Sequence, residues 1–116
     1  MKRAAIVLTT GFEEIEAIAP MDILRRAGVE VDIVGVSSNM VTGSHDLTIS
    51  TDKELVEVMN ELYDVLILPG GMPGAKLLKN HQEVQEFVKL HYDAGKIIAA
   101  NCAAPIAIEN SGALKD

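Results

Sequence analysis

Four short runs of apolar residues recur along the chain, each bounded by polar or glycine-containing segments. They are residues 4–8 (AAIVL), 29–36 (VEVDIVGV), 64–68 (DVLIL) and 96–100 (KIIAA). Runs rich in Val and Ile that are apolar on both faces are typical of strands buried in a parallel sheet. The pattern therefore predicts four parallel strands as the framework of the fold.

The segment after the first run has the apolar spacing and the end signals of a helix. Residues 13–27 begin with acidic side chains and end with two arginines, and Gly28 follows as a C-cap signal. Pro20 lies inside this segment, and proline removes a backbone donor from a helix. We therefore predict a helix over residues 13–27 with a kink or break at Pro20.

Two later segments also predict helices. They are residues 52–62 and residues 82–91, the second ended by Gly95. Residues 40–49 (MVTGSHDLTI) follow a different pattern and predict a hairpin or an inserted pair of edge strands. Strands that alternate with helices indicate an α/β doubly wound domain with right-handed crossovers.

Composition narrows the class of protein. The 116 residues are 48% hydrophobic and 23% charged, which suits one compact domain spanning residues 1–116. A formal net charge of −7, with two Phe, two Tyr and no Trp, argues against nucleic acid and anionic membranes as partners. No apolar stretch reaches the roughly 20 residues of a membrane span. One cysteine and no export signal predict a cytoplasmic protein.

The loops that follow the predicted strands carry the candidate chemistry. Parallel strands put these loops at one end of the sheet, where open α/β sheets bind their ligands. Cys102 lies at a strand-to-helix turn, where unpaired backbone N–H groups favour the thiolate. Filling of buried apolar space is the competing interpretation of this cysteine. Gly70 and Gly71 can aim backbone N–H groups at an oxyanion or simply form a tight turn.

Three glutamates, Glu13, Glu14 and Glu16, follow the first predicted strand. A solvated helix start is the ordinary interpretation of such residues. Because Glu16 points differently from Glu14 on a helix, we expect Glu16 to face the crevice and the other two to face water. A carboxyl group buried beside the thiol would stay protonated and donate a hydrogen bond to the thiolate.

The histidines give no clear catalytic or metal-binding pattern. We interpret all three as ordinary surface residues, although each is a possible base. No two of them have the spacing of metal ligands, and a single cysteine argues against structural zinc, so we predict no metal site. The glycine-rich residues 69–74 match neither a phosphate loop nor a dinucleotide fingerprint. The three histidines are His45, His81 and His91.

Three segments, in this order and spacing, match a known family. They are residues 11–17 (GFEEIEA), 68–74 (LPGGMPG) and 99–105 (AANCAAP). The chain resembles the ThiJ/PfpI superfamily, in its branch of parkinsonism-associated deglycases and bacterial ThiJ-like proteins. The resemblance covers essentially all of residues 1–116. It implies a homodimer and a flavodoxin-like fold, in which a doubly wound, mostly parallel sheet has helices on both faces.

The resemblance also assigns roles. Cys102 would be a nucleophile on a strained elbow, and Glu16 would be the protonated carboxyl bonded to it. Backbone N–H groups of Gly70, Gly71 and Ala103 would lie beside the thiol. The implied activity is cofactor-free hydrolysis of methylglyoxal or its adducts, so the substrate is a small reactive carbonyl or a glycated molecule. A redox sensor or holdase chaperone that works through oxidation of Cys102 is the alternative, and an inert dimerisation module is a third.

The far edge of the predicted sheet is left open after the fourth strand. Only one short predicted helix, about residues 104–110, follows Cys102. Family members continue well beyond the position of Asp116, with a histidine close to the cysteine, more sheet and a C-terminal helix. A second chain or a missing segment would complete the sheet. We expect the second, which makes residues 1–116 the N-terminal portion of a longer domain.

Overall fold

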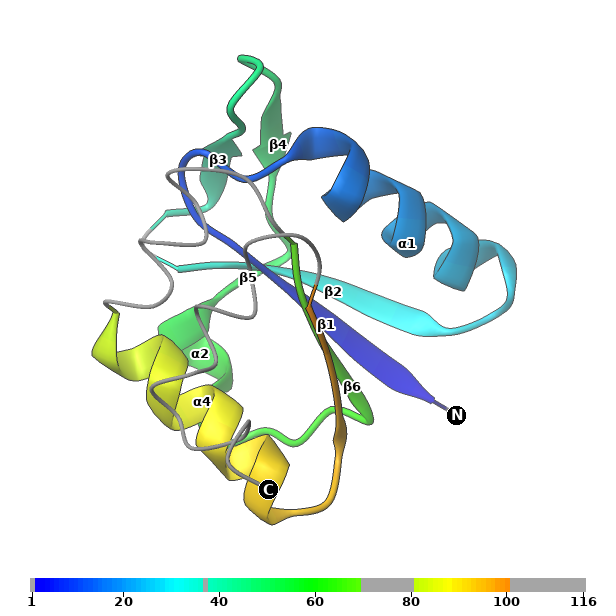
Figure 1. The fold of residues 1–116 in the computed structure, drawn as a ribbon, viewed down its shortest axis with the longest axis vertical. Helices are drawn as coiled ribbons and strands as arrows, with labels where there is room; N and C mark the ends of the chain where they lie inside the picture. Colours follow the sequence, from blue (N-terminus) through cyan, green and yellow to red (C-terminus); the bar gives the residue numbers. More distant parts are fainter. Residues whose placement is uncertain (1, 37, 70–80, 101–116) are drawn as a thin grey trace.

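Figure 1 shows the fold in a computed structural model, which describes residues 2–36, 38–69 and 81–100. Four of the five predicted site residues, and the short helix expected near residues 104–110, lie outside these ranges. The four are Gly70, Gly71, Cys102 and Ala103.

A parallel sheet forms the centre of the described residues. Its five strands lie in the order β5-β2-β1-β6-β7, and every neighbouring pair is parallel. The four predicted strands are confirmed, and a short edge strand, β5, is added to them. The strands are β1 (Arg3–Leu8), β2 (Glu30–Gly35), β5 (Lys53–Glu54), β6 (Val65–Leu68) and β7 (Ile97–Ala100).

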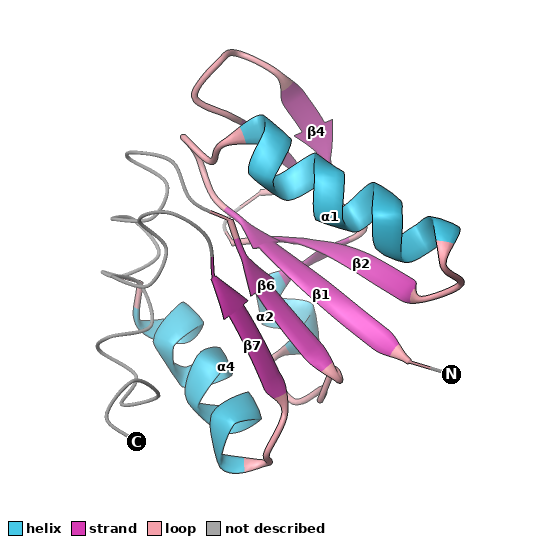
Figure 2. Ribbon diagram, turned by 45° about the vertical axis from the view of Figure 1, so that its right-hand side comes forward, coloured by secondary structure: helices cyan, strands magenta, loops and turns pink. Residues whose placement is uncertain are grey.

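Helices cover both faces of the sheet, as Figure 2 shows. Helix α1 (Glu14–Arg26) lies on one face, and α2 (Leu55–Val58) and α4 (Gln82–Asp93) lie on the other. Side chains of β1 alternate between the two cores: Ala5 and Val7 pack with α2 and α4, whereas Ile6 packs on the α1 side. None of the described helices is long and apolar enough to cross a membrane.

Helix α1 confirms the predicted bounds to within one residue at each end, but Pro20 does not break it. The expectation of a break was wrong because the packing of Ala17, Met21 and Leu24 against the sheet holds the helix together across the proline. Gly28, at φ +86°, takes the left-handed conformation that ends the helix.

The predicted helix over residues 52–62 is mostly wrong, because only Leu55–Val58 is helical. The preceding residues extend the sheet instead, as β5 pairs with the end of β2. Asp52 supports this pairing, since its Oδ2 accepts the Ile33 N–H at 2.8 Å. Residues 53 and 54 thus form a strand beside β2, although the apolar spacing of residues 52–62 is that of a helix.

The predicted hairpin is confirmed. Strands β3 (Met40–Thr42) and β4 (Thr48–Ser50) form a separate antiparallel pair, with Val41 opposite Ile49. Figure 1 shows this hairpin beside the first turn of α1, at the end of the sheet where β1 finishes.

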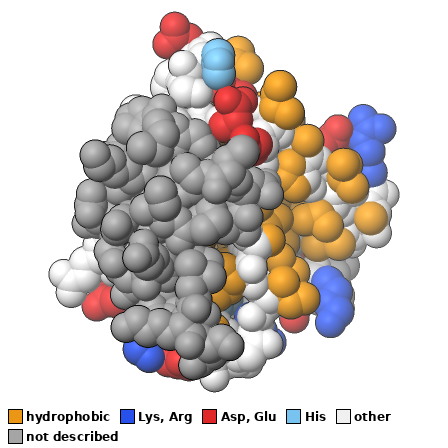
Figure 3. All heavy atoms as spheres, in the orientation of Figure 1, with side chains coloured by type: hydrophobic (Ala, Val, Ile, Leu, Met, Phe, Trp, Pro, Cys, Tyr) orange, Lys and Arg blue, Asp and Glu red, His pale blue; other side chains and the backbone are white. Residues whose placement is uncertain are grey.

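The outer surface of α1 is unusually apolar. Ile15 and Ile23 are 75% and 64% exposed, and Leu47 of the hairpin loop is also exposed. Hydrophobic side chains gather in a band on this part of the molecule (Figure 3). An exposed apolar patch of this kind is typical of an interaction surface.

His91 was expected at the surface, and this expectation was wrong: its side chain is fully buried, at 0% exposure. The spacing of residues 84, 87, 88 and 91 puts it on the inner face of α4. Its Nε2 accepts the Tyr63 N–H at 2.9 Å, and its Nδ1 lies 2.8 Å from the Phe87 carbonyl oxygen, to which it donates. Burial lowers the pKa of His91, against a smaller opposing effect of the Phe87 hydrogen bond.

This histidine predicts a pH dependence of stability. Since the folded-state pKa is depressed, only the unfolded state takes up a proton as the pH falls below about 6.5. The free energy of unfolding should then be at its full value above that pH and fall by at most on the order of 1 kcal/mol per pH unit below it. Urea denaturation between about pH 5 and 8 measures this slope. His91→Gln should flatten it, and an unchanged slope in that variant would contradict the prediction.

Candidate active site at the carboxyl edge of the sheet

Three strands end side by side at one edge of the sheet. In the register of the sheet, Ile6 of β1 pairs with Ile67 of β6, and Leu68 of β6 pairs with Ala100 of β7. Strands β6 and β7 therefore end next to each other, beside the loop that leads from β1 into α1. In open α/β sheets this edge is where ligands bind.

The predicted site residues lie either in the first turn of α1 or just after the ends of β6 and β7 in the sequence. Glu16 lies in the first turn of α1 and is half-buried. In the sequence, Gly70 comes two positions after Leu68, and Cys102 comes two positions after Ala100. Because the glycines, Cys102 and Ala103 lie outside the described residues, their contacts with Glu16 stay a prediction.

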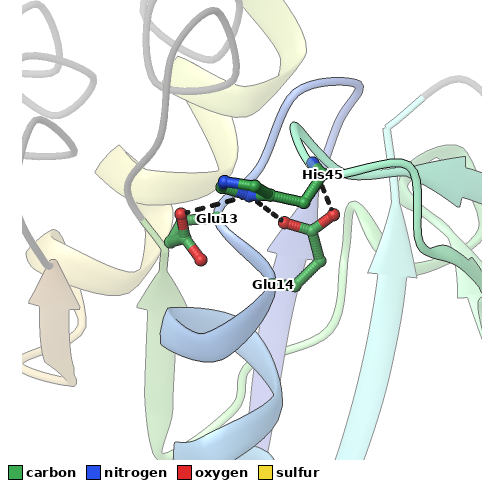
Figure 4. A group of neighbouring side chains, drawn as sticks. All are labelled: Glu13, Glu14 and His45. Carbon is green, nitrogen blue, oxygen red and sulfur yellow. Dashed lines mark hydrogen bonds and ion pairs between the residues drawn. The ribbon is translucent and has the colours of Figure 1, made fainter.

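Glu14 was expected to face water, and this expectation was wrong, because Glu14 is only 3% exposed. Its Oε2 accepts the backbone N–H groups of His45 at 2.8 Å and of Leu47 at 3.3 Å. Its Oε1 lies 3.1 Å from Nδ1 of His45 (Figure 4). We call these three contacts the Glu14 latch, and they tie the first residue of α1 to the loop of the β3–β4 hairpin.

The latch determines the charge state of Glu14. Burial raises the pKa of this carboxyl, but its own backbone N–H, those of His45 and Leu47, and the His45 ring outweigh burial and hold the pKa at about 2. Glu14 is therefore a carboxylate at neutral pH. It is hydrogen-bonded to backbone N–H groups, which do not titrate.

Gly43 makes room for the latch. A Cβ at this position would lie 2.8 Å from Cγ of Glu14, and closer still to its carboxyl group. Real Cβ atoms do not approach other atoms so closely, so any side chain here would push the Glu14 carboxyl out of place.

Two backbone hydrogen bonds reinforce the same junction. The Gly11 N–H donates to the Thr42 carbonyl at 3.0 Å, and the Ser44 N–H donates to the Phe12 carbonyl at 2.9 Å. The loop between β1 and α1 is thus joined to the start of the hairpin turn, just after β3. The start of α1 is held by the hairpin as well as by the sheet.

Glu13 and His45 complete a cluster around Glu14 (Figure 4). Oε1 of Glu13 accepts the Ile15 N–H at 3.2 Å and caps α1, while Oε2 lies 3.6 Å from Nδ1 of the exposed His45. Among the described residues, Glu13, Glu14 and His45 could hold a metal ion, with one ligand atom from each within 4.8 Å of the others. Ligand spacing in the sequence did not reveal this group because the histidine is distant along the chain. Both oxygens of Glu14 already accept hydrogen bonds, so the cluster fits a latch better than a metal site.

Hollows occur at both edges of the sheet. One of about 430 Å³ lies at the amino edge, between Lys2, Arg3, Asp64 and Lys96, far from the predicted chemistry. A smaller one, of about 220 Å³, is lined by the cluster of Glu13, Glu14 and His45 together with Ile15 and Leu47. We place the candidate site at the carboxyl edge because the strand ends converge there, although the hollow of about 430 Å³ lies at the opposite edge.

Comparison with known proteins decides the family. Residues 2–116 match the DJ-1/PfpI family. The chain belongs to the DJ-1/PfpI family. The resemblance seen in the three sequence motifs is therefore confirmed.

Individual DJ-1/PfpI members are similar over almost the whole chain. Protein DJ-1beta of Drosophila melanogaster is 36% identical over 96% of this chain and 60% of its own length. A deglycase of Pyrococcus abyssi is 31% identical over 97% of this chain and 68% of its own. Oxidised DJ-1 of Toxoplasma gondii superimposes with a TM-score of 0.95 at 36% identity, over 99% of this chain and 64% of that one. The predicted α/β fold with a mostly parallel sheet is confirmed, and the chain spans about 60% of the length of DJ-1beta.

The Glu14 latch predicts an acid-sensitive contribution to stability. The folded-state pKa of about 2 lies below the ordinary value of 4.5, so this contribution is complete above pH 4.5 and is lost as the pH falls toward 2. Glu14→Gln should lower the free energy of unfolding at neutral pH and lose less of it over that acid range. Denaturant titrations at several pH values measure both effects. Parallel pH curves for the two proteins would contradict the prediction.

Proposed function

We propose that this protein is a cysteine-dependent, cofactor-free stress-response protein that acts on reactive carbonyls. Cys102 supplies the nucleophilic thiolate and Glu16 the proton. The supporting observation is the strand register, because Leu68 and Ala100 end side by side next to the loop that leads to Glu16. Family membership and the name of the Pyrococcus abyssi relative, a deglycase, support the same chemistry.

The proposed reaction needs only water besides the substrate. The Cys102 thiolate adds to the aldehyde carbon of methylglyoxal, and the carbonyl electron pair moves to oxygen, which takes a proton from Glu16. Backbone N–H groups of Gly70, Gly71 and Ala103 stabilise the negative charge on that oxygen. The hydrogen of the former aldehyde carbon then moves as a proton to the neighbouring carbon through an enediol, which leaves a thioester. Water cleaves the thioester to lactate and regenerates the thiol.

Turnover by two variants tests this proposal. Cys102→Ser should abolish hydrolysis of methylglyoxal, and Glu16→Gln, which keeps the shape but cannot give up an acidic proton, should lower kcat by about 100-fold or more. Glu57→Gln is the matched control, because its carboxylate accepts the backbone N–H of Glu54, which caps α2 on the other face of the sheet. Steady-state lactate formation by the whole protein measures all three. A whole protein that never forms lactate would overturn the enzyme proposal.

A redox sensor or holdase chaperone is the second candidate function. It is favoured by one observation, that the similar Toxoplasma gondii DJ-1 is described as oxidised. In this reading a peroxide transfers one oxygen to the Cys102 thiolate and leaves as water, and a second peroxide completes the sulfinate. A reducing cytoplasm would return the protein only from the first of these states. Cells in which Glu16→Gln removes lactate formation but keeps stress protection, while Cys102→Ser removes both, would favour a function through oxidation of Cys102.

We also propose that the protein is a homodimer that pairs through α1. The exposed Ile15 and Ile23, with Leu47 of the hairpin loop, provide an apolar patch of the kind that protein interfaces bury.

Sedimentation velocity of the whole protein measures its mass in solution. We expect a dimer for the wild type and a monomer for Ile15→Asp, because a buried unpaired carboxylate would oppose pairing. Val56→Asp, at an apolar side chain of similar exposure on α2, is the matched control and should stay dimeric. A monomeric wild type would show the proposal to be wrong.

A further inference from the structure

We propose that Glu14, through its latch to the β3–β4 hairpin, is a positioning residue that aims Glu16 at the carboxyl edge of the sheet. This inference rests on the proposed role of Glu16 as the proton donor to Cys102. It gives the hairpin, which lies outside the main sheet, a function in the site.

The first step of the argument is the geometry of the first turn of α1. Glu14 and Glu16 are two residues apart on one helix, and each residue of an α-helix turns the side-chain direction by about 100°. The two carboxyl groups therefore leave the helix on nearly opposite sides. A rotation of this turn that moves one of them moves the other by the same angle.

The second step is that Glu14 cannot rotate freely. Its carboxylate is buried, and both of its oxygens are bonded to groups of the hairpin loop, at 2.8–3.3 Å. Gly43 lies directly against the same carboxyl group and leaves no space behind it. Because charge-assisted hydrogen bonds to fixed backbone donors are directional, the latch sets the rotation of the first turn about the helix axis.

The third step is the direction in which Glu16 then points. The hairpin follows β2 in the chain and, in Figure 4, lies on one side of the start of α1, while β6 and β7 lie on the other. The sheet order agrees with this view, because β2 and β6 flank β1 on opposite sides. With Glu14 held on the hairpin side, Glu16 is directed to the side on which β6 and β7 end.

The test measures how fast iodoacetamide alkylates Cys102, the one cysteine of the chain, as a function of pH. Glu16→Ala removes the hydrogen bond to the thiolate and should raise the pH midpoint of alkylation by about one unit. At a pH below the midpoint, alkylation should then be about tenfold slower. Glu14→Gln and Gly43→Ala should move the midpoint in the same direction. Glu57→Gln, which loses a carboxylate bond to a backbone N–H at α2, should leave it unchanged.

A double-mutant cycle separates positioning from a general loss of stability. If Glu14 acts through Glu16, Glu14→Gln combined with Glu16→Ala should shift the midpoint no further than Glu16→Ala alone. Fully additive shifts would overturn the inference, because Glu14 would then act on Cys102 without Glu16. If Glu14→Gln does not fold, Gly43→Ala replaces it in the cycle, since it keeps every hydrogen-bonding group.

A second readout distinguishes failure of this inference from failure of the proposed function. The ¹³C resonance of the Glu16 carboxyl should move in Gly43→Ala, a substitution distant along the chain, and stay in place in Glu57→Gln. An unmoved resonance in Gly43→Ala overturns the positioning role. A resonance that moves, together with a Glu16→Ala midpoint equal to that of the wild type, supports the positioning role and refutes the pairing of Glu16 with Cys102.

Discussion

The burial of one carboxylate, that of Glu14, is the constraint on which the carboxyl edge of this fold depends. A buried charge is costly unless donors surround it, and here the donors are backbone N–H groups of a loop that belongs to no helix and not to the main sheet. The hairpin must therefore stay against the start of α1, and Gly43 must stay without a side chain. The local structure of three segments thus follows from satisfying one charge.

The parallel sheet supplies the second half of the site. Its order puts β1 between β2 and β6, so the hairpin that follows β2 and the strand ends of β6 and β7 lie on opposite sides of the start of α1. Helix α1 is consequently held from one side and exposed to the candidate chemistry on the other. This arrangement lets one helical turn carry a structural glutamate, Glu14, and the proposed proton donor, Glu16, only two positions apart.

Much of the fold followed from apolar patterning, because the buried strands and the inner faces of α1 and α4 are mostly apolar. The failures have specific causes. Lys53 and Glu54 pair with β2 because the Asp52 carboxylate accepts the Ile33 N–H of β2, a contact that a pattern of apolar side chains does not predict. His91 was misplaced because histidine is usually polar surface, although its spacing on α4 matched Val84, Phe87 and Val88. The sequence predicted that Glu16 faces the crevice and that Glu14 faces water. The prediction for Glu14 was wrong because its hydrogen-bond partners come from the β3–β4 hairpin, which is distant along the chain.

The sequence by itself determined four of the five described strands of the main sheet, two of the helices, the hairpin and the family, because these depend on periodicity and on contiguous motifs. It also determined which residues could carry chemistry, namely one cysteine, three glutamates and a pair of glycines. Only the tertiary structure decided that Glu14 is buried and ionised, that Gly43 and His45 adjoin it, and that His91 accepts a hydrogen bond from Tyr63. The physical reason is that each of these depends on donors supplied from distant positions in the chain, and local patterns do not contain the identity of such partners.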